Sequence, residues 1–213
     1  MKSNSEGLII DGVVAYIDRD NIDTDQIIPT EYLKSIKKFG FEDYLFDGWR
    51  YKDDGKLGIT KDERVIDEKF ILNKNPFNES KILLTRDNFG CGSSREHAVW
   101  ALMDYGFEVV ISTSFADIFY NNCFKNGILP LKVTEDQRQA LLADARDEEN
   151  PVLEIDLPNQ IIKRPNGVSI KFDLDPFRKE CLLEGLDDIS LTLAKKDKIQ
   201  EYENVRNKSF PWL

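Results

Sequence analysis

The sequence contains very little histidine and little cysteine. Among its 213 residues there are one histidine and three cysteines, and no two cysteines form a Cys-x-x-Cys pair. An odd number of widely spaced cysteines argues against a disulfide framework and against a self-contained zinc or iron–sulfur site. We therefore expect that this chain binds no metal cofactor by itself.

Excess positive charge and long apolar runs are missing as well. The formal net charge is −10, which argues against partners such as nucleic acid or an anionic membrane surface. No apolar run approaches the length of a membrane span, and residues 1–6 lack the apolar core of a signal peptide. We therefore expect a cytoplasmic protein. The hydrophobic content of 41% and the charged content of 32% are typical of a globular domain.

The most informative stretch is residues 88–97, with the sequence Asn-Phe-Gly-Cys-Gly-Ser-Ser-Arg-Glu-His. It follows an apolar run at 82–84 that predicts a buried strand. The apolar residues after it have the spacing of one helix face: Ala98, Ala101, Leu102 and Tyr105. Folds of the α/β class place ligands at such strand-to-helix turns, and glycines there allow a ligand to approach the backbone closely. We interpret this stretch as an active-site loop.

The start of the predicted helix favours an anion. Ser93 and Glu96 have the spacing of a capping box, so the helix is expected to begin at Ser94 or Arg95 with unbonded N–H groups at its first turn. Those N–H groups, the helix dipole and the guanidinium of Arg95 together predict a binding site for a carboxylate.

Three residues of this loop each admit a structural and a catalytic role. Ser93 as a helix cap would contribute about 1 kcal/mol, and spacing alone favours that role. As a catalytic base it would need an alkoxide stabilised by N–H groups and positive charge. Cys91 is either a low-pKa thiolate or a small side chain in a crowded turn, and the second is favoured. His97 would have to serve any hydrolase triad, but its place in the first helical turn favours a structural role.

Around the loop, the pattern predicts a parallel α/β core within one domain, residues 1–213. The predicted strands and helices alternate in the order 82–84, 95–105, 109–111, 115–125 and 128–131. One face of the second helix is expected to carry Phe115, Ile118, Phe119 and Cys123. The apolar pieces 8–10 and 13–17 are expected to be strands around an Asp11-Gly12 turn.

The C-terminal third of the sequence changes character. Thr134 and Gln137 predict a capped helix that runs to about Arg146. Three alternating segments then predict a small antiparallel meander: 152–157, 160–163 and 168–172. Helical stretches are expected at 188–196 and 198–207.

Two segments before the loop leave alternatives open. Residues 18–29 contain many carboxylates. They form either a polar surface loop or a loop in which one carboxylate orients a catalytic group elsewhere in the chain. A calcium loop is excluded, because Asp23 stands where glycine is needed and Pro29 where glutamate is needed. A short helix is expected at 30–36. Residues 39–80 form a long irregular insert, whose aromatic residues either cover this domain's own core or dock on a partner protein.

Residues 90–97 resemble the G-x-G-S-S-R-E-H signature of the swivelling domain of the aconitase superfamily. Residues 21–29, 114–119 and 126–130 agree with the same domain in order and distance. Residues 43–51 and the length resemble, in particular, the small subunits of bacterial 3-isopropylmalate dehydratases. The resemblance covers nearly the whole chain and implies a three-layer β/β/α swivelling domain.

The activity that the resemblance implies is that of a hydro-lyase in leucine biosynthesis. Such an enzyme interconverts 2-isopropylmalate and 3-isopropylmalate through 2-isopropylmaleate. A [4Fe–4S] cluster in the family binds the substrate hydroxyl and carboxylate, and a serine takes the proton from carbon.

Transferred to this sequence, the resemblance makes Ser93 the base and Arg95 the carboxylate clamp. Ser94 becomes a substrate contact, and Asp25 a charged member of the site. Leu33 and Lys34 would lie where the substrate's side group is distinguished. Aconitases carry an arginine near there, whereas this chain has three lysines: Lys34, Lys37 and Lys38.

The residue inventory also fits half of an active site. A base, an anion clamp and an N–H cradle are present, whereas clustered cysteines are missing. We therefore expect the [4Fe–4S] cluster in a partner large subunit, in a heterodimer or higher assembly. The isolated chain is expected to be inactive.

Three alternatives remain: a hydro-lyase small subunit for a related diacid such as citraconate or homoaconitate, a hydrolase built on Cys91 or Ser93 with His97, and a non-catalytic carboxylate-binding module.

Overall fold

The computed structural model describes residues 8–35, 37–210 and 212. Its strands are β1 (Ile9–Tyr16), β2 (Ile82–Leu84), β3 (Val109–Ser112), β4 (Leu129–Lys132), β5 (Val152–Asp156), β6 (Ile161–Lys163) and β7 (Ser169–Lys171). Its helices are α1 (Thr24–Ile27), α2 (Asp47–Arg50), α3 (Glu96–Tyr105), α4 (Asp117–Asn126), α5 (Glu135–Ala145), α6 (Pro176–Glu184), α7 (Asp188–Leu193) and α8 (Lys196–Ser209).

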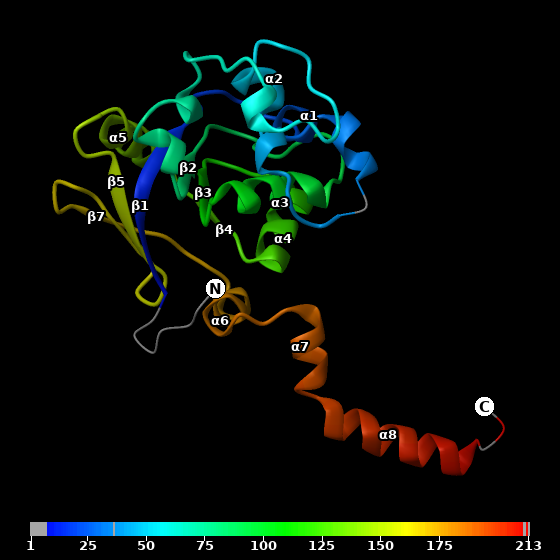
Figure 1. Cartoon of the computed structure of the whole chain (residues 1–213). Coiled ribbons are helices and arrows are strands. Elements are labelled where there is room, and N and C mark those ends of the chain that lie inside the picture. Colours follow the sequence, from blue (N-terminus) through cyan, green and yellow to red (C-terminus); the bar gives the residue numbers. More distant parts are fainter. Residues whose placement is uncertain (1–7, 36, 211, 213) are drawn as a thin grey trace.

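All seven strands belong to one mixed sheet with the order β4-β3-β2-β1-β5-β6-β7 (Figure 1). The first four strands in this order pair in parallel, and β1, β5, β6 and β7 pair antiparallel. The parallel unit β2-α3-β3-α4-β4 and the antiparallel meander β5-β6-β7 confirm the architecture predicted from the sequence.

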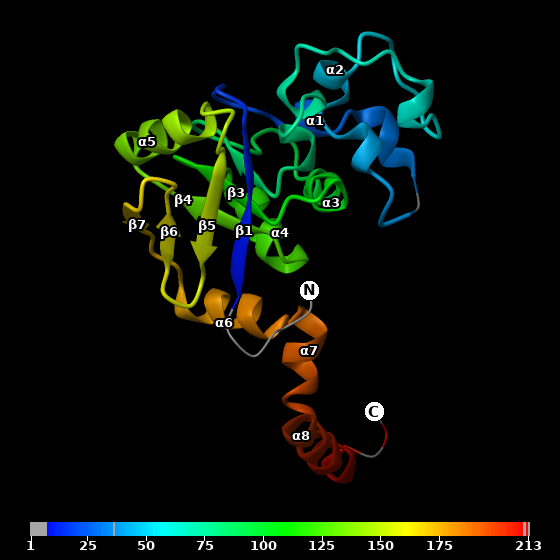
Figure 2. The same cartoon turned by 60° about the vertical axis from the view of Figure 1, so that its left-hand side comes forward.

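The parallel strands are covered on both faces, which makes the fold three layers deep (Figure 2). Leu83 and Val110 belong to the core cluster that includes residues of α3 and α4. Their neighbours Ile82 and Ile111 belong to a second cluster, with residues of α5 and the meander. Successive side chains of a strand point to opposite faces, so these short apolar strands serve two cores at once.

Strand β1 differs from the expectation. The predicted turn at Asp11-Gly12 is wrong, because the chain stays extended there as part of one strand. Asp11 and Gly12 pair with Glu154 and Leu153 of β5, and this partner is too distant in sequence for a local pattern to reveal. A side chain at Gly12 would meet Lys81.

Helix α5 fixes the carboxylate-rich loop. Thr134 and Gln137 form the predicted capping box. The buried Arg138 donates a hydrogen bond from Nη1 to Asp18 at 3.1 Å, and Arg146 donates one from Nη2 at 3.2 Å. Asp18 therefore joins the start of this loop to α5, which is a structural role.

Aromatic residues of the insert at 39–80 cover this chain's own core. Of the two alternatives for this segment, packing on the core is therefore favoured over docking on a partner protein. Phe41, Tyr44 and Phe46 are buried in the same cluster as α3 and α4. Besides α2, the insert contains four short 3-10 helices: Glu42–Tyr44, Lys61–Glu63, Ile71–Asn73 and Phe77–Glu79. The expected helix at 30–36 is a 3-10 helix, Thr30–Lys34, and Ile36 lies outside the described residues.

The C-terminal helices leave the body of the molecule. Helix α6 packs Leu182 on the second core cluster, whereas α7 and α8 project outward (Figures 1 and 2). The predicted helix at 188–196 ends earlier, at Leu193, and the predicted helix at 198–207 is extended at both ends as α8. Within the described residues, no helix combines the length and apolarity that crossing a bilayer requires.

Candidate active site

The loop between β2 and α3 is fixed by backbone bonds to the segment around α1. The N–H of Gly90 donates to the carbonyl of Ile22 at 2.8 Å, and the N–H of Thr24 donates to the carbonyl of Cys91 at 2.9 Å. Gly90 has φ +75°, and a Cβ there would lie 2.1 Å from Phe119 Cγ. The loop can therefore take this path only with glycine at position 90.

We expect Gly90→Ala to lower the free energy of unfolding by about 3 kcal/mol, because left-handed strain adds to a steric conflict with the buried Phe119. Gly167→Ala is the matched control, since Gly167 has φ +81° and an added Cβ would meet no atom within 4 Å. It should cost only about 1 kcal/mol. Urea denaturation of both variants measures the difference, and equal losses would contradict the steric argument.

Helix α3 begins later than predicted, and Ser93 is not its cap. The N-cap is Arg95, which is extended (φ −132°, ψ 110°) and makes no side-chain capping bond. The Glu96 carboxylate accepts a bond from Asn126 Nδ2 on α4 at 2.9 Å, and the Ser93 carbonyl accepts one from Thr24 Oγ1 at 3.0 Å. These tertiary contacts replace the capping box, so the capping role assigned to Ser93 from spacing was wrong.

The structure brings Arg95 and Asp25 together across 70 residues of sequence. Arg95 donates from Nη1 to Asp25 Oδ1, and Thr30 Oγ1 donates to the same oxygen at 2.6 Å. The hydrogen bond from Arg95, followed by that from Thr30, lowers the pKa of Asp25 from its ordinary 3.8. A lowered folded-state pKa means that the pair stabilises the fold above about pH 4 and loses this effect as the pH falls through the lowered value.

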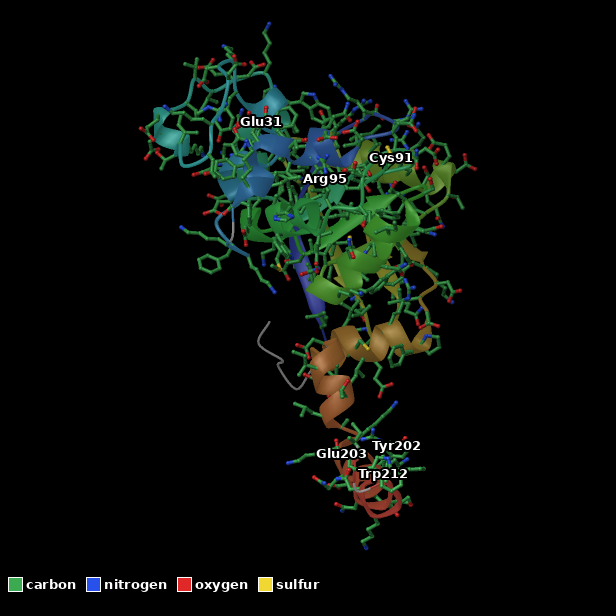
Figure 3. The ribbon with its side chains drawn as sticks, turned by 90° about the vertical axis from the view of Figure 1, so that its right-hand side faces the viewer. Glu31, Cys91, Arg95, Tyr202, Glu203 and Trp212 are labelled. Atoms are coloured by element: carbon green, nitrogen blue, oxygen red, sulfur yellow. The ribbon has the colours of Figure 1, made fainter. Side chains whose placement is uncertain are left out.

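Ser93, Ser94 and Arg95 line one cavity of about 260 Å³. Thr24, Gly90, Gly92 and residues 116–119 complete its wall. Both serine side chains are exposed, and their hydroxyls make no hydrogen bond within the described part of the chain. Figure 3 places Arg95 and Cys91 in the body of the molecule, far from Tyr202 on α8. Ile118 borders this cavity and is 54% exposed, so it does not share one face with the buried Phe119 and Cys123 as predicted.

Leu33 and Lys34 do not line this cavity. Leu33 is half-buried against the first core cluster, and Lys34 is exposed. They are nevertheless tied to the site, because Thr30, in the same 3-10 helix, bonds to Asp25. Thr24 and Thr30 are contacts that were not predicted from the sequence; Thr24 directly precedes Asp25, and Thr30 follows the carboxylate-rich stretch at 18–29.

His97 and Cys91 have structural surroundings. His97 lies 4.6 Å from Trp100 and 5.5 Å from Phe41 between ring centroids, and burial lowers its pKa. Burial, followed by the carboxylate of Asp23, raises the pKa of the Cys91 thiol. A neutral thiol and an imidazole packed among aromatic rings do not support a hydrolase built on these two residues.

The cysteines do not provide a place for an iron–sulfur cluster. Cys123 is fully buried in α4, while Cys91 and Cys181 lie in the site loop and in α6. Within the described residues, no three His, Cys, Asp or Glu side chains are grouped so that they could hold a metal ion. The described residues of this chain therefore do not fit a cluster.

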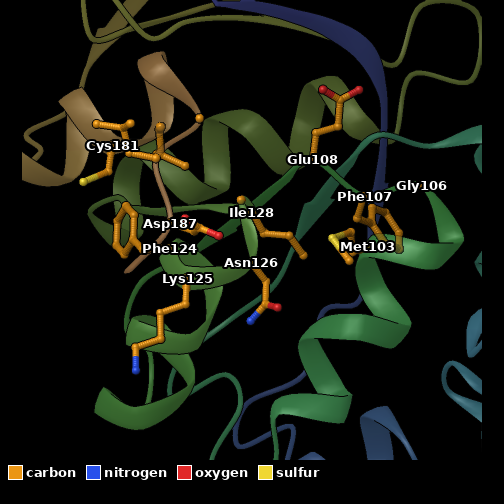
Figure 4. Close-up of a pocket in the computed structure, with 14 residues that line it drawn as sticks. Met103, Gly106, Phe107, Glu108, Phe124, Lys125, Asn126, Ile128, Cys181 and Asp187 are labelled. Atoms are coloured by element: carbon orange, nitrogen blue, oxygen red, sulfur yellow. The ribbon is translucent and has the colours of Figure 1, made fainter. Parts of the chain in front are cut away.

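A larger cavity, of about 520 Å³, lies at the other end of α3 (Figure 4). Its lining includes Gly106 and Gly127, which end α3 and α4, and Cys181 on α6. The ten residues of α3 separate the two cavities by about 15 Å. No predicted site residue lines the larger cavity, so its size does not make it the candidate site.

Family models cover most of this chain. Residues 6–136 match the aconitase C-terminal domain, residues 139–176 match LeuD_N, and residues 188–213 match the C-terminal domain of the 3-isopropylmalate dehydratase small subunit. The 3-isopropylmalate dehydratase small subunit of Magnetococcus marinus is 52% identical, over 95% of this chain and 95% of its own. The chain belongs to the family of 3-isopropylmalate dehydratase small subunits.

Other members of this family agree. The small subunits of Neisseria gonorrhoeae and Xanthobacter autotrophicus are 51% and 52% identical, each over 96% of this chain and at least 96% of their own. Among solved structures, the 3-isopropylmalate dehydratase (LeuD) of Methanocaldococcus jannaschii has a TM-score of 0.63 at 29% identity, covering 92% of this chain and 99% of its own. The swivelling-domain fold predicted from the sequence is thereby confirmed.

Proposed function

We propose that this chain is the small subunit of a hydro-lyase that interconverts 2-isopropylmalate and 3-isopropylmalate through 2-isopropylmaleate in leucine biosynthesis. Family membership supports the dehydratase activity. The observation that carries the mechanism is the cavity in which Arg95, held by Asp25, lies beside two serines whose hydroxyls are not engaged elsewhere in the described chain.

Arg95 binds a substrate carboxylate in this proposal. One of its N–H groups is engaged by Asp25, and the remaining donors of the planar guanidinium can pair with a second carboxylate. The N–H groups at the first turn of α3 and the positive end of its dipole add attraction for an anion. Asp25 is a positioning residue here, because it fixes one edge of the guanidinium.

Ser93 takes the proton from the substrate carbon. A serine hydroxyl is a poor base in water, so its alkoxide has to be stabilised by the positive charge of Arg95 and by N–H groups of the loop and helix. The exposed side chain of Ser93 makes no competing capping bond, which leaves the oxygen available. Ser94 contacts the substrate beside it. Leu33 and Lys34 lie outside the cavity wall, and the proposal assigns them to the substrate's side group because Thr30, in the same 3-10 helix, bonds to Asp25.

The other half of the site comes from a large subunit. A C–H beside a carboxylate is a weak acid, and a serine alone would not remove its proton at a useful rate. In our proposal a [4Fe–4S] cluster belongs to that partner and would supply the Lewis acid for the substrate hydroxyl. We further propose that residues 1–213 act as one swivelling domain, in a cytoplasmic heterodimer or higher assembly.

The test is reconstitution. The isolated chain should form no conjugated alkene diacid from 2-isopropylmalate, and absorbance of the alkene should appear after mixing with a cluster-loaded large subunit. A parallel panel with citramalate and homocitrate separates the related diacid hydro-lyases. Turnover by the chain alone would refute the proposal, and a clear preference for another diacid would correct the substrate.

A further inference from the structure

The segment Thr30–Lys34 is anchored on two sides. On the side of the site, Thr30 Oγ1 donates to Asp25, the partner of Arg95, at 2.6 Å. On the side of the insert, the Tyr32 hydroxyl donates to Asp47 Oδ1 at 2.9 Å within the core. Leu33 follows Tyr32 directly in the same 3-10 helix, so its position depends on both anchors.

Asp47 is held in turn by Arg64. The guanidinium of Arg64 donates from both Nη atoms to the Asp47 carboxylate, and from Nε to Asp53 at 2.9 Å. The side chains of Arg64 and Asp47 are only 1% and 9% exposed. Removing both charges from water is costly, and the planar fork of arginine compensates only in a narrow geometry. The pair therefore defines one place for the acceptor of the Tyr32 hydroxyl.

The ring and the hydroxyl of Tyr32 are both closely packed. The ring stacks on Tyr44, with centroids 4.0 Å apart and planes 6° apart. Next to the hydroxyl lies Gly55, where a Cβ would come within 1.7 Å of Tyr32 Oη and 2.7 Å of Arg64 Nη1. A glycine at position 55 is thus a condition for the whole arrangement.

We propose that Asp47 and Arg64 are positioning residues that fix the Thr30–Lys34 segment through Tyr32. They thereby determine which side group the enzyme prefers on its substrate. The inference rests on the proposed function, in which Leu33 and Lys34 face that side group. A contact surface distinguishes an isopropyl from a methyl group only if it is held at a constant distance from the bound substrate. The buried Asp47–Arg64 pair keeps the segment in one position. The insert at 39–80 thereby has a functional role in addition to covering the core.

The test measures substrate preference in the enzyme assembled with its large subunit. Tyr32→Phe removes one hydroxyl and keeps the ring, while Gly55→Ala pushes a methyl group toward that hydroxyl. In each variant, the ratio of kcat/KM for 2-isopropylmalate to kcat/KM for citramalate (2-methylmalate) should fall about tenfold. The matched control is Asn73→Ala, which removes bonds from Asn73 Nδ2 to the Arg50 and Asp67 carbonyls elsewhere in the insert. It should lower the thermal midpoint and leave the ratio unchanged.

Two results separate this inference from the function on which it rests. If Tyr32→Phe and Gly55→Ala keep the wild-type ratio while their thermal midpoints fall as in Asn73→Ala, the network is purely structural and the inference is overturned. If the wild-type assembly does not convert 2-isopropylmalate at all, the proposed function fails, whatever the variants do.

Discussion

Ser93→Ala should lower kcat of the assembled enzyme by about 1,000-fold, with KM and assembly nearly unchanged. Loss of a positioned base typically costs about 10² to 10⁴ in rate. Ser93 makes no capping bond, so its truncation removes no hydrogen bond from the cap of α3. A steady-state assay of alkene formation, with size-exclusion chromatography of the two-subunit complex, measures both quantities.

Two further serines provide the controls. Ser94→Ala changes the neighbouring hydroxyl in the same cavity and should act mainly on KM, since a substrate contact is lost without loss of the base. Ser169 lies exposed on β7, away from this cavity, and Ser169→Ala should be indistinguishable from wild type. Full activity of Ser93→Ala would exclude Ser93 as the base.

The parallel core could be predicted because its signals are local. The apolar run Ile82–Leu84 and the helical spacing after it became β2 and α3. Gly127 ends α4 in the left-handed conformation that glycine favours. Capping residues and apolar periodicity report on neighbours within a few positions, so these elements needed no knowledge of the tertiary fold.

The errors arose where distant segments override a local pattern. The Asp11-Gly12 turn failed because pairing with β5 keeps that stretch extended. The capping role of Ser93 failed because Asn126 and Thr24 engage the side chain of Glu96 and the carbonyl of Ser93. Neither partner is near the motif in sequence, and no spacing rule could have included them.

The candidate site was predicted in part. The sequence identified Ser93, Ser94 and Arg95 as one loop, and the resemblance added Asp25, which the structure places against Arg95. The Asp47–Arg64 pair could not be predicted, because in sequence the two residues resemble ordinary charges in an irregular segment. Only their burial, which costs free energy unless the charges are paired, distinguishes them from the surface charges around them.

Arg95→Gln should reduce kcat/KM of the assembled enzyme by about 100-fold to 1,000-fold, mostly through KM, because the charge-assisted bonds to the substrate carboxylate are lost. Arg95→Lys keeps the charge but not the planar fork, and should recover only part of the loss. Arg146 pairs with Asp18 at the surface, 3.2 Å apart, so Arg146→Gln controls for the change in net charge. An unchanged KM in Arg95→Gln would refute the clamp.

The contribution of Asp25 can be separated from that of Arg95 with a double-mutant cycle. Asp25→Asn leaves the guanidinium in place but weakens its attachment, and should lower kcat/KM by about tenfold. In the Arg95→Gln background the same substitution should have almost no further effect, since Asp25 then has no guanidinium to orient. Equal effects in both backgrounds would mean that Asp25 acts on the substrate directly. If Asp25→Asn lowers kcat/KM only when Arg95 is present, the two residues act as a pair. Asp25 then orients Arg95 so that the remaining N–H groups of the guanidinium point to the substrate.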